Sequence, residues 1–442
     1  MFDVRNKRVT VAGLGKFGGQ IAAAKWLVQN GAKVLVTDRT PAEKLADSIK
    51  ALDALPIEFR LGEHREGDFT SADLVVATPA IPPQNAYVAA ARTAGVPVTT
   101  EIQLFIERCP ARILGVTGTK GKSTTTALLG RMLATKHAVH VGGNIGRPLL
   151  LDLPKIRQSD LVVLELSSFM LEYLRGLAWS PHVAVVTMLA TDHVDWHGSA
   201  AAYLDAKKTI LKHQRPKDFA VLPNGMPHTD ELACLTRGRV VLFDTKGEPF
   251  ELKAPGWHNQ FNCKAAFAAA EVMGVSFGAA QAAVRDFAGL PHRLQLVHEA
   301  GGVRWFNDSI ATIPEAAIAA LESFAPSTVL QIVGGSDKGL PFTGLANALC
   351  QRAKAVLCIG ATGPAIGRLV AECDAGGRAR VHACGDLPAA VARAKEIAAP
   401  GDVVLLSTGC ASYDQFANFE QRGDDFARLA RGGDPPSAAP PV

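Results

Sequence analysis

The segment that most constrains this chain is an apolar stretch followed at once by a loop of glycine and lysine. Ile113–Thr117 predicts a buried strand, Gly118-Thr119-Lys120-Gly121-Lys122 forms the loop, and Ser123-Thr124 begins a predicted helix. A loop of this kind presents backbone N–H groups, a lysine and a hydroxyl to phosphate groups, and the helix dipole favours an anion there. The usual glycine spacing places glycine at position 116, where this chain has Val116. The segment therefore predicts a variant triphosphate-binding loop.

Apolar stretches like this one alternate with predicted helices along most of the chain. Unbroken apolar strands are typical of parallel sheets that are buried on both faces, so we expect an α/β fold. We expect three domains: a Rossmann-like domain at 1–110, a central phosphate-loop domain at 111–294 and a second Rossmann-like domain at 295–431. The residues 432–442, rich in glycine, proline and alanine, predict a disordered tail. The other expected strands are Val9–Ala12, Lys33–Thr37, Leu74–Ala77, Leu161–Leu166, Val183–Thr187, Val303–Phe306, Thr328–Val333, Ala355–Ile359, Arg380–Ala383 and Asp402–Ser407.

Composition excludes several classes of protein. The chain has 46 basic and 42 acidic residues, and this net charge of +4 does not predict a nucleic-acid partner. No apolar run reaches the roughly 20 residues that span a bilayer, so no membrane partner is expected. The 8 cysteines form no Cys-x-x-Cys pair, and we expect reduced thiols in a cytoplasmic protein.

A second glycine-rich turn, Gly13-Leu14-Gly15-Lys16-Phe17-Gly18, follows the first predicted strand. Asp38 closes the next strand, where a ribose-binding acid stands in dinucleotide-binding proteins. The residues alone leave two interpretations open for this turn, a dinucleotide such as NAD or another nucleotide or phosphate group.

Metal-capable side chains follow the strands of the central module. Glu165 ends the strand 161–166, Asp192-His193 follows the strand 183–187, and Lys207 lies on a predicted helix. Carboxyl ends of parallel strands line the ligand crevice of such a sheet, and oxygen ligands there suit Mg²⁺.

Further polar residues lie near the expected domain joins and in the third module. An arginine and amide side chains at a join suit the binding of phosphates or carboxylates. A glycine-rich turn with Lys338 predicts a site for an anionic substrate, although turns alone would also explain such sequences. These segments are Pro255–Asn259, Asn262, Leu290–Arg293, Asn307-Asp308-Ser309, Gly334–Gly339 and Ser407–Arg422.

Taken together, these motifs resemble the Mur ligases of peptidoglycan synthesis, in their order and spacing, from Val9 to about Arg431. The ending 411–423 most resembles the members that join glutamate to UDP-N-acetylmuramoyl-L-alanine. The motifs are Thr117–Thr124, Gly142-Gly143-Asn144-Ile145-Gly146, Glu165–Phe169, Asp192–Asp195, Gly256–Asn259, Pro291-His292-Arg293 and Ala411–Gly423.

The resemblance implies an enzyme that uses ATP to form an amide between UDP-N-acetylmuramoyl-L-alanine and D-glutamate through an acyl phosphate. The alternative is the same ligation with L-glutamate. It also implies that the first glycine turn holds the UDP part of the substrate and not NAD. The small-molecule partners would then be ATP, glutamate and the UDP substrate. The family's UDP contacts fall on Leu14, Gly15, Lys16, Asp38 and Arg39.

The resemblance also assigns roles to the remaining residues. Lys122, Asn144, His193 and Lys207 would be catalytic, and Ser123, Glu165, His193 and Lys207 would hold two Mg²⁺ ions, with Lys207 carbamylated. The expected glutamate contacts are Thr312, Lys338, Ser412 and Phe419. The expected ATP contacts are Gly118, Thr119, Lys120, Gly121, Lys122, Ser123, Thr124, Asn259, Asn262, Arg293 and Asp308.

The chain departs from the family pattern beside the predicted glutamate and nucleotide sites. Ile310 and Ile313 stand where the family has lysine and asparagine, so amino-acid specificity stays open between D- and L-glutamate. Two further alternatives are an amide ligase with another acceptor and a nucleotide-binding regulator without activity. The intact Lys122, Glu165, His193 and Lys207 argue against the regulator.

Overall fold

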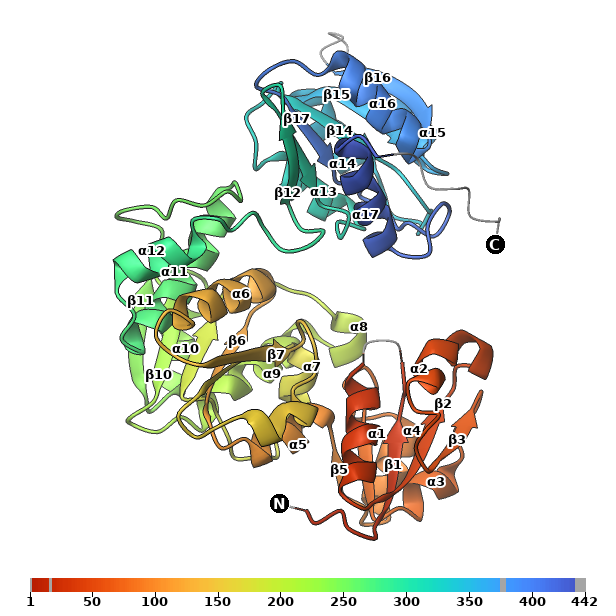
Figure 1. Ribbon diagram of the computed structural model, residues 1–442, viewed down its shortest axis with the longest axis vertical. Helices are drawn as coiled ribbons and strands as arrows, with labels where there is room; N and C mark the ends of the chain where they lie inside the picture. Colours follow the sequence, from red (N-terminus) through yellow and green to blue (C-terminus); the bar gives the residue numbers. More distant parts are fainter. Residues whose placement is uncertain (1, 16–17, 374–378, 434–442) are drawn as a thin grey trace. The chain divides into compact units, whose positions relative to one another are not determined.

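A computed structural model describes residues 2–15, 18–373 and 379–433 of the chain. Within these residues the strands form three sheets, and the α/β prediction is confirmed (Figure 1). Contacts divide the chain into two compact units. Unit 1 contains Met1–Pro249 and Phe261–Ala283 with the first two sheets, and unit 2 contains Phe250–Gln260 and Val284–Val442 with the third.

The first sheet has the strand order β3-β2-β1-β4-β5, with every pair parallel. Chain order reverses at β1, since β2 and β4 lie on its two sides, and such a switch point opens a crevice at the carboxyl edge. The strands are β1 (Arg8–Ala12), β2 (Lys33–Asp38), β3 (Ile57–Leu61), β4 (Leu74–Ala77) and β5 (Val98–Thr99). The helices are α1 (Gly19–Gln29), α2 (Ala46–Lys50), α3 (Glu66–Thr70), α4 (Ala86–Thr93) and α5 (Glu101–Arg108).

The second sheet, also parallel, has the order β11-β10-β9-β6-β8-β7. Its switch point lies at β6, between β8 and β9, so the loop that follows β6 stands at the crevice. The strands are β6 (Arg112–Thr117), β7 (Val139–Gly143), β8 (Leu161–Glu165), β9 (Val183–Val186), β10 (Phe219–Pro223) and β11 (Arg239–Phe243). The helices that follow along the chain are α6 (Lys122–Leu133), α7 (Ser168–Leu174), α8 (Val194–His197), α9 (Ala200–Lys212), α10 (Thr229–Leu235), α11 (Trp257–Val272) and α12 (Phe277–Val284).

The third sheet has the order β12-β13-β17-β14-β15-β16 and one antiparallel pair, β12 with β13. Its strands are β12 (Gln295–Ala300), β13 (Val303–Asn307), β14 (Val329–Val333), β15 (Ala353–Ile359), β16 (Arg380–Gly385) and β17 (Val403–Leu406). Its helices are α13 (Pro314–Leu321), α14 (Thr343–Arg352), α15 (Gly363–Cys373), α16 (Leu387–Ile397) and α17 (Phe419–Ala430). Of the predicted tail, Gly432 and Gly433 close the end of α17 through backbone hydrogen bonds, and 434–442 lie outside the described residues.

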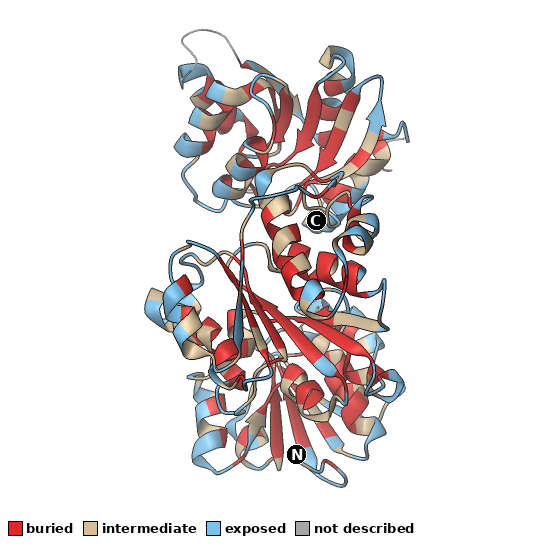
Figure 2. Cartoon of the chain, turned by 90° about the vertical axis from the view of Figure 1, so that its left-hand side faces the viewer, coloured by how far each residue is buried: buried red, intermediate tan, exposed pale blue. Residues whose placement is uncertain are grey.

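Central strands of each sheet carry the core. β4, β8, β9, β14 and β17 are buried along their whole length, and Figure 2 shows the buried residues concentrated on the strands. Because parallel strands covered on both faces exclude water, their apolar side chains supply much of the hydrophobic stabilisation of each unit.

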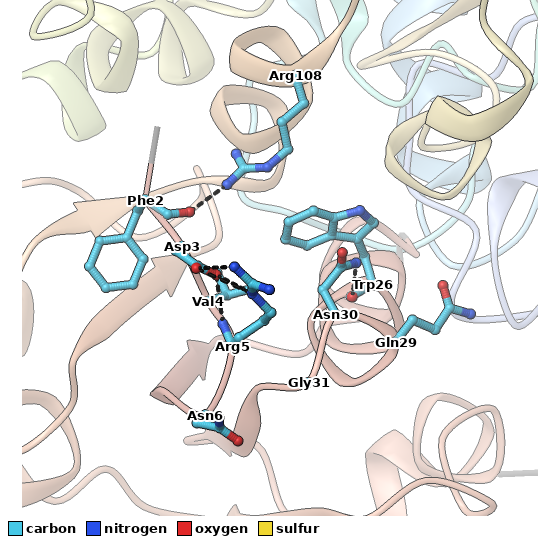
Figure 3. A pocket seen from close by; sticks show the side chains of 10 residues that line it. All are labelled: Phe2, Asp3, Val4, Arg5, Asn6, Trp26, Gln29, Asn30, Gly31 and Arg108. Carbon is cyan, nitrogen blue, oxygen red and sulfur yellow. Dashed lines mark hydrogen bonds and ion pairs between the residues drawn. The ribbon is translucent and has the colours of Figure 1, made fainter.

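A hollow of about 630 Å³ lies at the amino edge of the first sheet, opposite the edge that carries the glycine turn (Figure 3). The Arg108 guanidinium stacks 4.8 Å from the Trp26 ring and donates a hydrogen bond to the Phe2 carbonyl at 2.8 Å. The hollow is therefore separate from the predicted nucleotide sites.

Candidate functional site

The loop after β6 has a backbone that only glycine permits. Gly121 caps α6 with φ of 88°, and a Cβ there would lie 2.2 Å from the Asn262 side-chain oxygen. The Lys122 ammonium donates to the carbonyls of Gly118 at 3.0 Å and Thr119 at 2.9 Å. The predicted loop and helix start are thus present, with Ser123 half-buried and Thr124 buried in the first turn.

The segment after β9 supports this loop from one side. The Thr119 and Lys120 amides donate to the Met188 carbonyl at 2.7 and 3.4 Å. The Thr187 hydroxyl donates to the Lys120 carbonyl at 2.7 Å, and the Tyr203 hydroxyl donates to Thr119 Oγ1 at 2.9 Å. These contacts hold the loop against α9 and the end of β9.

Glu165 ends β8 beside the loop, and its carboxylate is almost completely buried. The Asn144 side-chain amide donates to Glu165 Oε1 at 2.9 Å, and the Asn144 backbone amide donates to the Glu165 carbonyl at 2.9 Å. Glu165 Oε2 is buried without a hydrogen-bond partner. A buried carboxylate oxygen without a donor is costly, so this atom is suited to accept a cation or a donor from a ligand.

Lys207 lies on α9 with only 2% of its surface exposed, and its ammonium position faces the phosphate loop. Its Nζ donates to the Gly118 carbonyl at 2.7 Å and lies 4.7 Å from the centre of the Tyr203 ring. Burial, and then the nearby Lys122 charge, lower the pKa of Lys207 to about 6. The amine is therefore mostly neutral at physiological pH, whereas its neighbour Lys208 forms an ion pair with Glu231.

His193 lies at the N-terminus of α8, with its side chain half exposed and a left-handed backbone of φ 47°. Its ring packs 4.9 Å from the Phe169 ring, and its Nε2 lies 3.6 Å from the Asp192 carboxylate. The same aromatic cluster includes Tyr203, whose ring centre is 6.2 Å from that of His193. His193 and Lys207 thus both lie near the Tyr203 ring.

The first glycine turn forms at the carboxyl edge of β1. A Cβ on Gly13, which has φ of 81°, would lie 2.5 Å from the Thr78 methyl group. The Gly15 amide donates to Asp38 Oδ2 at 3.1 Å, and the Thr40 amide donates to Asp38 Oδ1 at 2.8 Å. Asp38 therefore fixes the turn through backbone contacts. Leu14 is buried, Arg39 is exposed, and the predicted contact Lys16 lies outside the described residues.

The two asparagines that are expected to contact ATP, Asn259 and Asn262, belong to different units. In unit 1, Asn262 packs against Gly121, and its carbonyl accepts a hydrogen bond from the Thr125 hydroxyl at 3.4 Å. In unit 2, the Asn259 side chain donates to the Pro255 carbonyl at 2.6 Å. Both side chains are buried, and each contacts residues of its own unit.

Unit 2 brings Arg293 and Asp308 together. The residues on both sides of Arg293, His292 and Leu294, have positive φ values of 59° and 40°. Asp308 accepts hydrogen bonds from the Leu294 amide at 3.1 Å and the Ser407 hydroxyl at 2.7 Å. Burial raises the pKa of Asp308 to about 7, and the hydrogen bonds and the Arg293 charge oppose that rise.

The remaining predicted contacts of unit 2 lie on neighbouring segments. The turn 334–339, which carries the exposed Lys338, pairs with 411–414 through a Ser336–Ala411 bridge and a Ser336–Asp414 hydrogen bond of 3.2 Å. Ser412 on that second segment is buried. Thr312 and Phe419 are half-buried, and the Phe419 ring packs 6.0 Å from that of His292.

A buried guanidinium that sequence reasoning did not single out holds these segments together. Arg422 is 1% exposed and donates to the Ser309 hydroxyl and carbonyl at 2.8 Å each, and to the Cys410 carbonyl at 3.1 Å. Burial lowers the pKa of Arg422 to about 10. A periodicity argument would have revealed it, because Arg422 occupies an inward position of α17 between Phe419 and Phe426.

The part of the chain that the structure describes contains neither a cluster of acidic, histidine and cysteine side chains nor a helix that could cross a membrane. No group of three or more His, Cys, Asp or Glu side chains converges within residues 2–15, 18–373 and 379–433. Within the same residues no helix is both long and apolar enough to cross a bilayer.

Sequence models of three domains match the chain. The Mur ligase MurD-like N-terminal domain matches residues 7–100, the Mur ligase middle domain matches 116–249, and the Mur ligase glutamate ligase domain matches 292–410.

Known proteins resemble the chain over nearly its full length. It is 42% identical to UDP-N-acetylmuramoylalanine--D-glutamate ligase of Roseiflexus sp. (strain RS-1), covering 97% of this chain and 99% of the relative. The enzyme of the same name from Symbiobacterium thermophilum is 38% identical over 96% of this chain and 97% of its own length.

Solved structures share the fold. UDP-N-acetylmuramate-alanine ligase of Thermotoga maritima has a TM-score of 0.60 at 20% identity and covers 96% of this chain and 99% of its own. The MurF ligase of Thermotoga maritima, solved in complex with ADP, has a TM-score of 0.57 at 18% identity over 97% of this chain and 96% of its own. Domain matches, full-length relatives and fold agree, and the chain belongs to the Mur ligase family.

Proposed function

We propose that this chain is an ATP-dependent ligase that joins D-glutamate to UDP-N-acetylmuramoyl-L-alanine through an acyl phosphate, in the synthesis of peptidoglycan precursors. The names of the full-length relatives support D-glutamate, and none of those quoted above favours the L-glutamate alternative. The observation that carries the proposal is that Lys122 and Lys207 converge on the Gly118 carbonyl beside the buried Glu165.

The reaction requires an activated carboxylate, because oxide is a poor leaving group. A carboxylate oxygen of the alanyl end attacks the γ-phosphorus of ATP, and ADP leaves. The amine of glutamate then attacks the acyl carbon, a proton is lost, and phosphate departs with one of the original carboxylate oxygens. Such phosphoryl transfer depends mainly on positioning and charge neutralisation.

The loop Gly118–Thr124 would bind the phosphates of ATP. The dipole of α6 favours anions at its N-terminus, and Lys122 lies in the first turn of that helix. On nucleotide binding, the Lys122 ammonium would exchange the Gly118 and Thr119 carbonyls for phosphate oxygens. The support of Thr119 by Tyr203 and Met188 keeps the loop in place during this exchange.

Ser123 and Glu165 fit a first Mg²⁺ ion. Mg²⁺ prefers oxygen ligands, and the partnerless Glu165 Oε2 offers a buried anionic oxygen beside the loop. Bound Mg²⁺ would neutralise charge on the phosphoryl group as it transfers. The Asn144 amide orients the other carboxylate oxygen, and Asn144 is also the proposed donor to the acyl phosphate.

Lys207 fits the role of a carbamylated metal ligand together with His193. Carbamylation requires the neutral amine, which attacks CO₂ and loses a proton to leave an anionic carbamate. The lowered pKa of Lys207 supplies that neutral amine. A carbamate oxygen attracts a second Mg²⁺ ion, whereas the ammonium of a lysine repels it.

The substrate contacts at the two other sheets follow the family pattern. At the first sheet, Leu14, Gly15, Lys16, Asp38 and Arg39 would bind the UDP group. In unit 2, Arg293 and Asp308 would contact the nucleotide, and the glutamate contacts would be Thr312, Lys338, Ser412 and Phe419. The amides Asn259 and Asn262 complete the proposed ATP contacts, and we infer a cytoplasmic enzyme because ATP and the UDP substrate are cytoplasmic metabolites.

An assay of ADP formation with D- and L-glutamate side by side tests the proposal. Purified enzyme with UDP-N-acetylmuramoyl-L-alanine, ATP and Mg²⁺ should release ADP with D-glutamate, at least about tenfold faster than with L-glutamate. Omission of the UDP substrate should reduce the rate to background. A higher rate with L-glutamate would overturn the stereochemical assignment, and no ADP with any amino acid would overturn the ligase.

A further inference from the structure

The loop after β4 lies against the first glycine turn. The Thr78 amide donates to the Ala12 carbonyl at 2.9 Å, and the Ile81 amide donates to the Thr78 carbonyl at 3.0 Å. The space beside Gly13 is filled by Thr78 and by the Ile81 side chain, at 2.5 and 3.3 Å from an added Cβ. A shift of residues 78–81 would therefore displace the glycine turn.

Two side chains on helices of the second sheet donate hydrogen bonds to two consecutive carbonyl groups of this loop. The Trp196 indole N–H on α8 donates to the Ala80 carbonyl at 3.0 Å, and the Tyr173 hydroxyl on α7 donates to the Ile81 carbonyl at 2.8 Å. Figure 1 shows α8 next to the first sheet. Burial raises the pKa of Tyr173 to about 12, so its hydroxyl remains a donor at any physiological pH.

His193 caps the N-terminus of the helix that bears Trp196. The Phe169 ring packs on both side chains, 4.5 Å from the Trp196 ring and 4.9 Å from the His193 ring. The adjacent His197 is buried and hydrogen-bonds to the Ser168 hydroxyl at 3.0 Å, which fixes α8 from its other end. α8 is a single turn, so Trp196 and His193 cannot move independently.

We propose that Trp196 and Tyr173 are positioning residues that couple the UDP-binding turn of the first sheet to His193 and the phosphoryl-transfer residues of the second. This inference rests on the proposed function, because it assigns the turn 13–15 to the UDP group. Binding of the UDP substrate orders the loop 78–81. The hydrogen bond of Trp196 extends that order to α8, and the hydrogen bond of Tyr173 extends it to α7, whose Phe169 packs on His193. The same contacts work in reverse, since coupling between two binding sites is reciprocal.

Variants that remove the donors and keep an aromatic side chain at each position test this role. Tyr173→Phe and Trp196→Phe should each raise KM for the UDP substrate about fivefold, as expected for the loss of one hydrogen bond, and the double variant should raise it about twentyfold. KM for ATP, measured with the UDP substrate well below its own KM so that the coupling does not contribute, should change by less than about twofold, because the two hydrogen bonds end on the loop 78–81 and not on the phosphate loop. Tyr87→Phe is the matched control. It removes a tyrosine hydroxyl from the same unit while its ring keeps its contacts with Phe69 and His64.

Isothermal titration provides a readout that a purely structural role would not change. In the wild type, a saturating amount of UDP-N-acetylmuramoyl-L-alanine should tighten binding of a non-hydrolysable ATP analogue. The double variant should bind the analogue alone normally and lose that tightening. Equal tightening in wild type and double variant, or equal rises in both KM values, would overturn the inference. A wild type that forms no ADP with the UDP substrate would instead overturn the proposed function.

Discussion

Replacement of Lys207 by methionine should make unit 1 more stable while it abolishes activity. The folded pKa of Lys207 is lowered from 10.5 to about 6, so between these values the folded protein holds a neutral amine and the unfolded chain holds an ammonium. Unfolding then takes up a proton, and the cost of burying Lys207 grows as pH falls from 10.5 towards 6. Methionine has a similar length and no titratable group, so its burial carries no such pH-dependent cost.

The size of the effect follows from the two pKa values. Each pH unit between them is worth about 1.4 kcal/mol, so near pH 7.5 the buried amine costs up to about 4 kcal/mol. Methionine also loses the hydrogen bond to the Gly118 carbonyl, worth about 1 to 2 kcal/mol, although Lys122 still donates to that oxygen. The net gain is about 2 kcal/mol, or a rise in Tm of about 5 °C for a unit of this size.

Thermal unfolding of Lys207→Met and wild type in CO₂-free buffer measures this gain. The Tm difference should be largest near pH 6, should fall to zero between about pH 9 and 10, and should reverse near pH 10.5, where only the lost hydrogen bond remains. Lys208→Met is the matched control, since Lys208 forms an ion pair with the exposed Glu231 and should change stability by less than about 1 kcal/mol. A Lys207→Met protein that is less stable than wild type near pH 7.5, or a difference that does not vary with pH, would refute the reasoning.

Three further variants test the site. Lys207→Ala should lose ligase activity, and formate or another short carboxylate should restore part of it; full activity without the additive would exclude the carbamate role. Gly121→Ala should weaken ADP binding at least about tenfold in calorimetry. The added Cβ would lie 2.2 Å from Asn262 Oδ1, at a position where the backbone φ is 88°. An ADP affinity equal to that of the wild type would contradict the steric argument. Glu165→Ala should raise the Mg²⁺ concentration for half-maximal activity at least about tenfold, whereas an unchanged Mg²⁺ titration would remove Glu165 from the metal site.

The sequence predicted the central strands well and the edge strands poorly. Strands such as β4, β8 and β17 are buried on both faces, so their residues form unbroken apolar runs. The strands β3, β5, β7, β11 and β12 were not predicted, and each lies at the edge of its sheet, where polar residues such as Glu58 and Arg239 are tolerated. β10 was also missed, although it is an inner strand with an apolar sequence.

The candidate site also contains some residues that could be predicted from the sequence and others that could not. The glycine loop and Glu165 could be predicted because a backbone conformation or a strand end demands those residue types at a fixed spacing. The supports of the loop, Thr187 and Tyr203, could not, since their role depends on hydrogen bonds between segments 67 and 84 residues apart. Trp196 and Tyr173 belong to the same class, because neither side chain belongs to a recognisable motif.

The fate of the carboxylate oxygen tests the acyl-phosphate ligase most directly. UDP-N-acetylmuramoyl-L-alanine labelled with ¹⁸O in its terminal carboxylate would be incubated with enzyme, ATP, Mg²⁺ and D-glutamate, and the released phosphate analysed by mass spectrometry. Attack of that carboxylate on the γ-phosphorus predicts one ¹⁸O atom in each phosphate released, in equal amount to the amide formed. Amide formation with unlabelled phosphate would contradict an acyl phosphate, and phosphate release without amide would contradict the ligase.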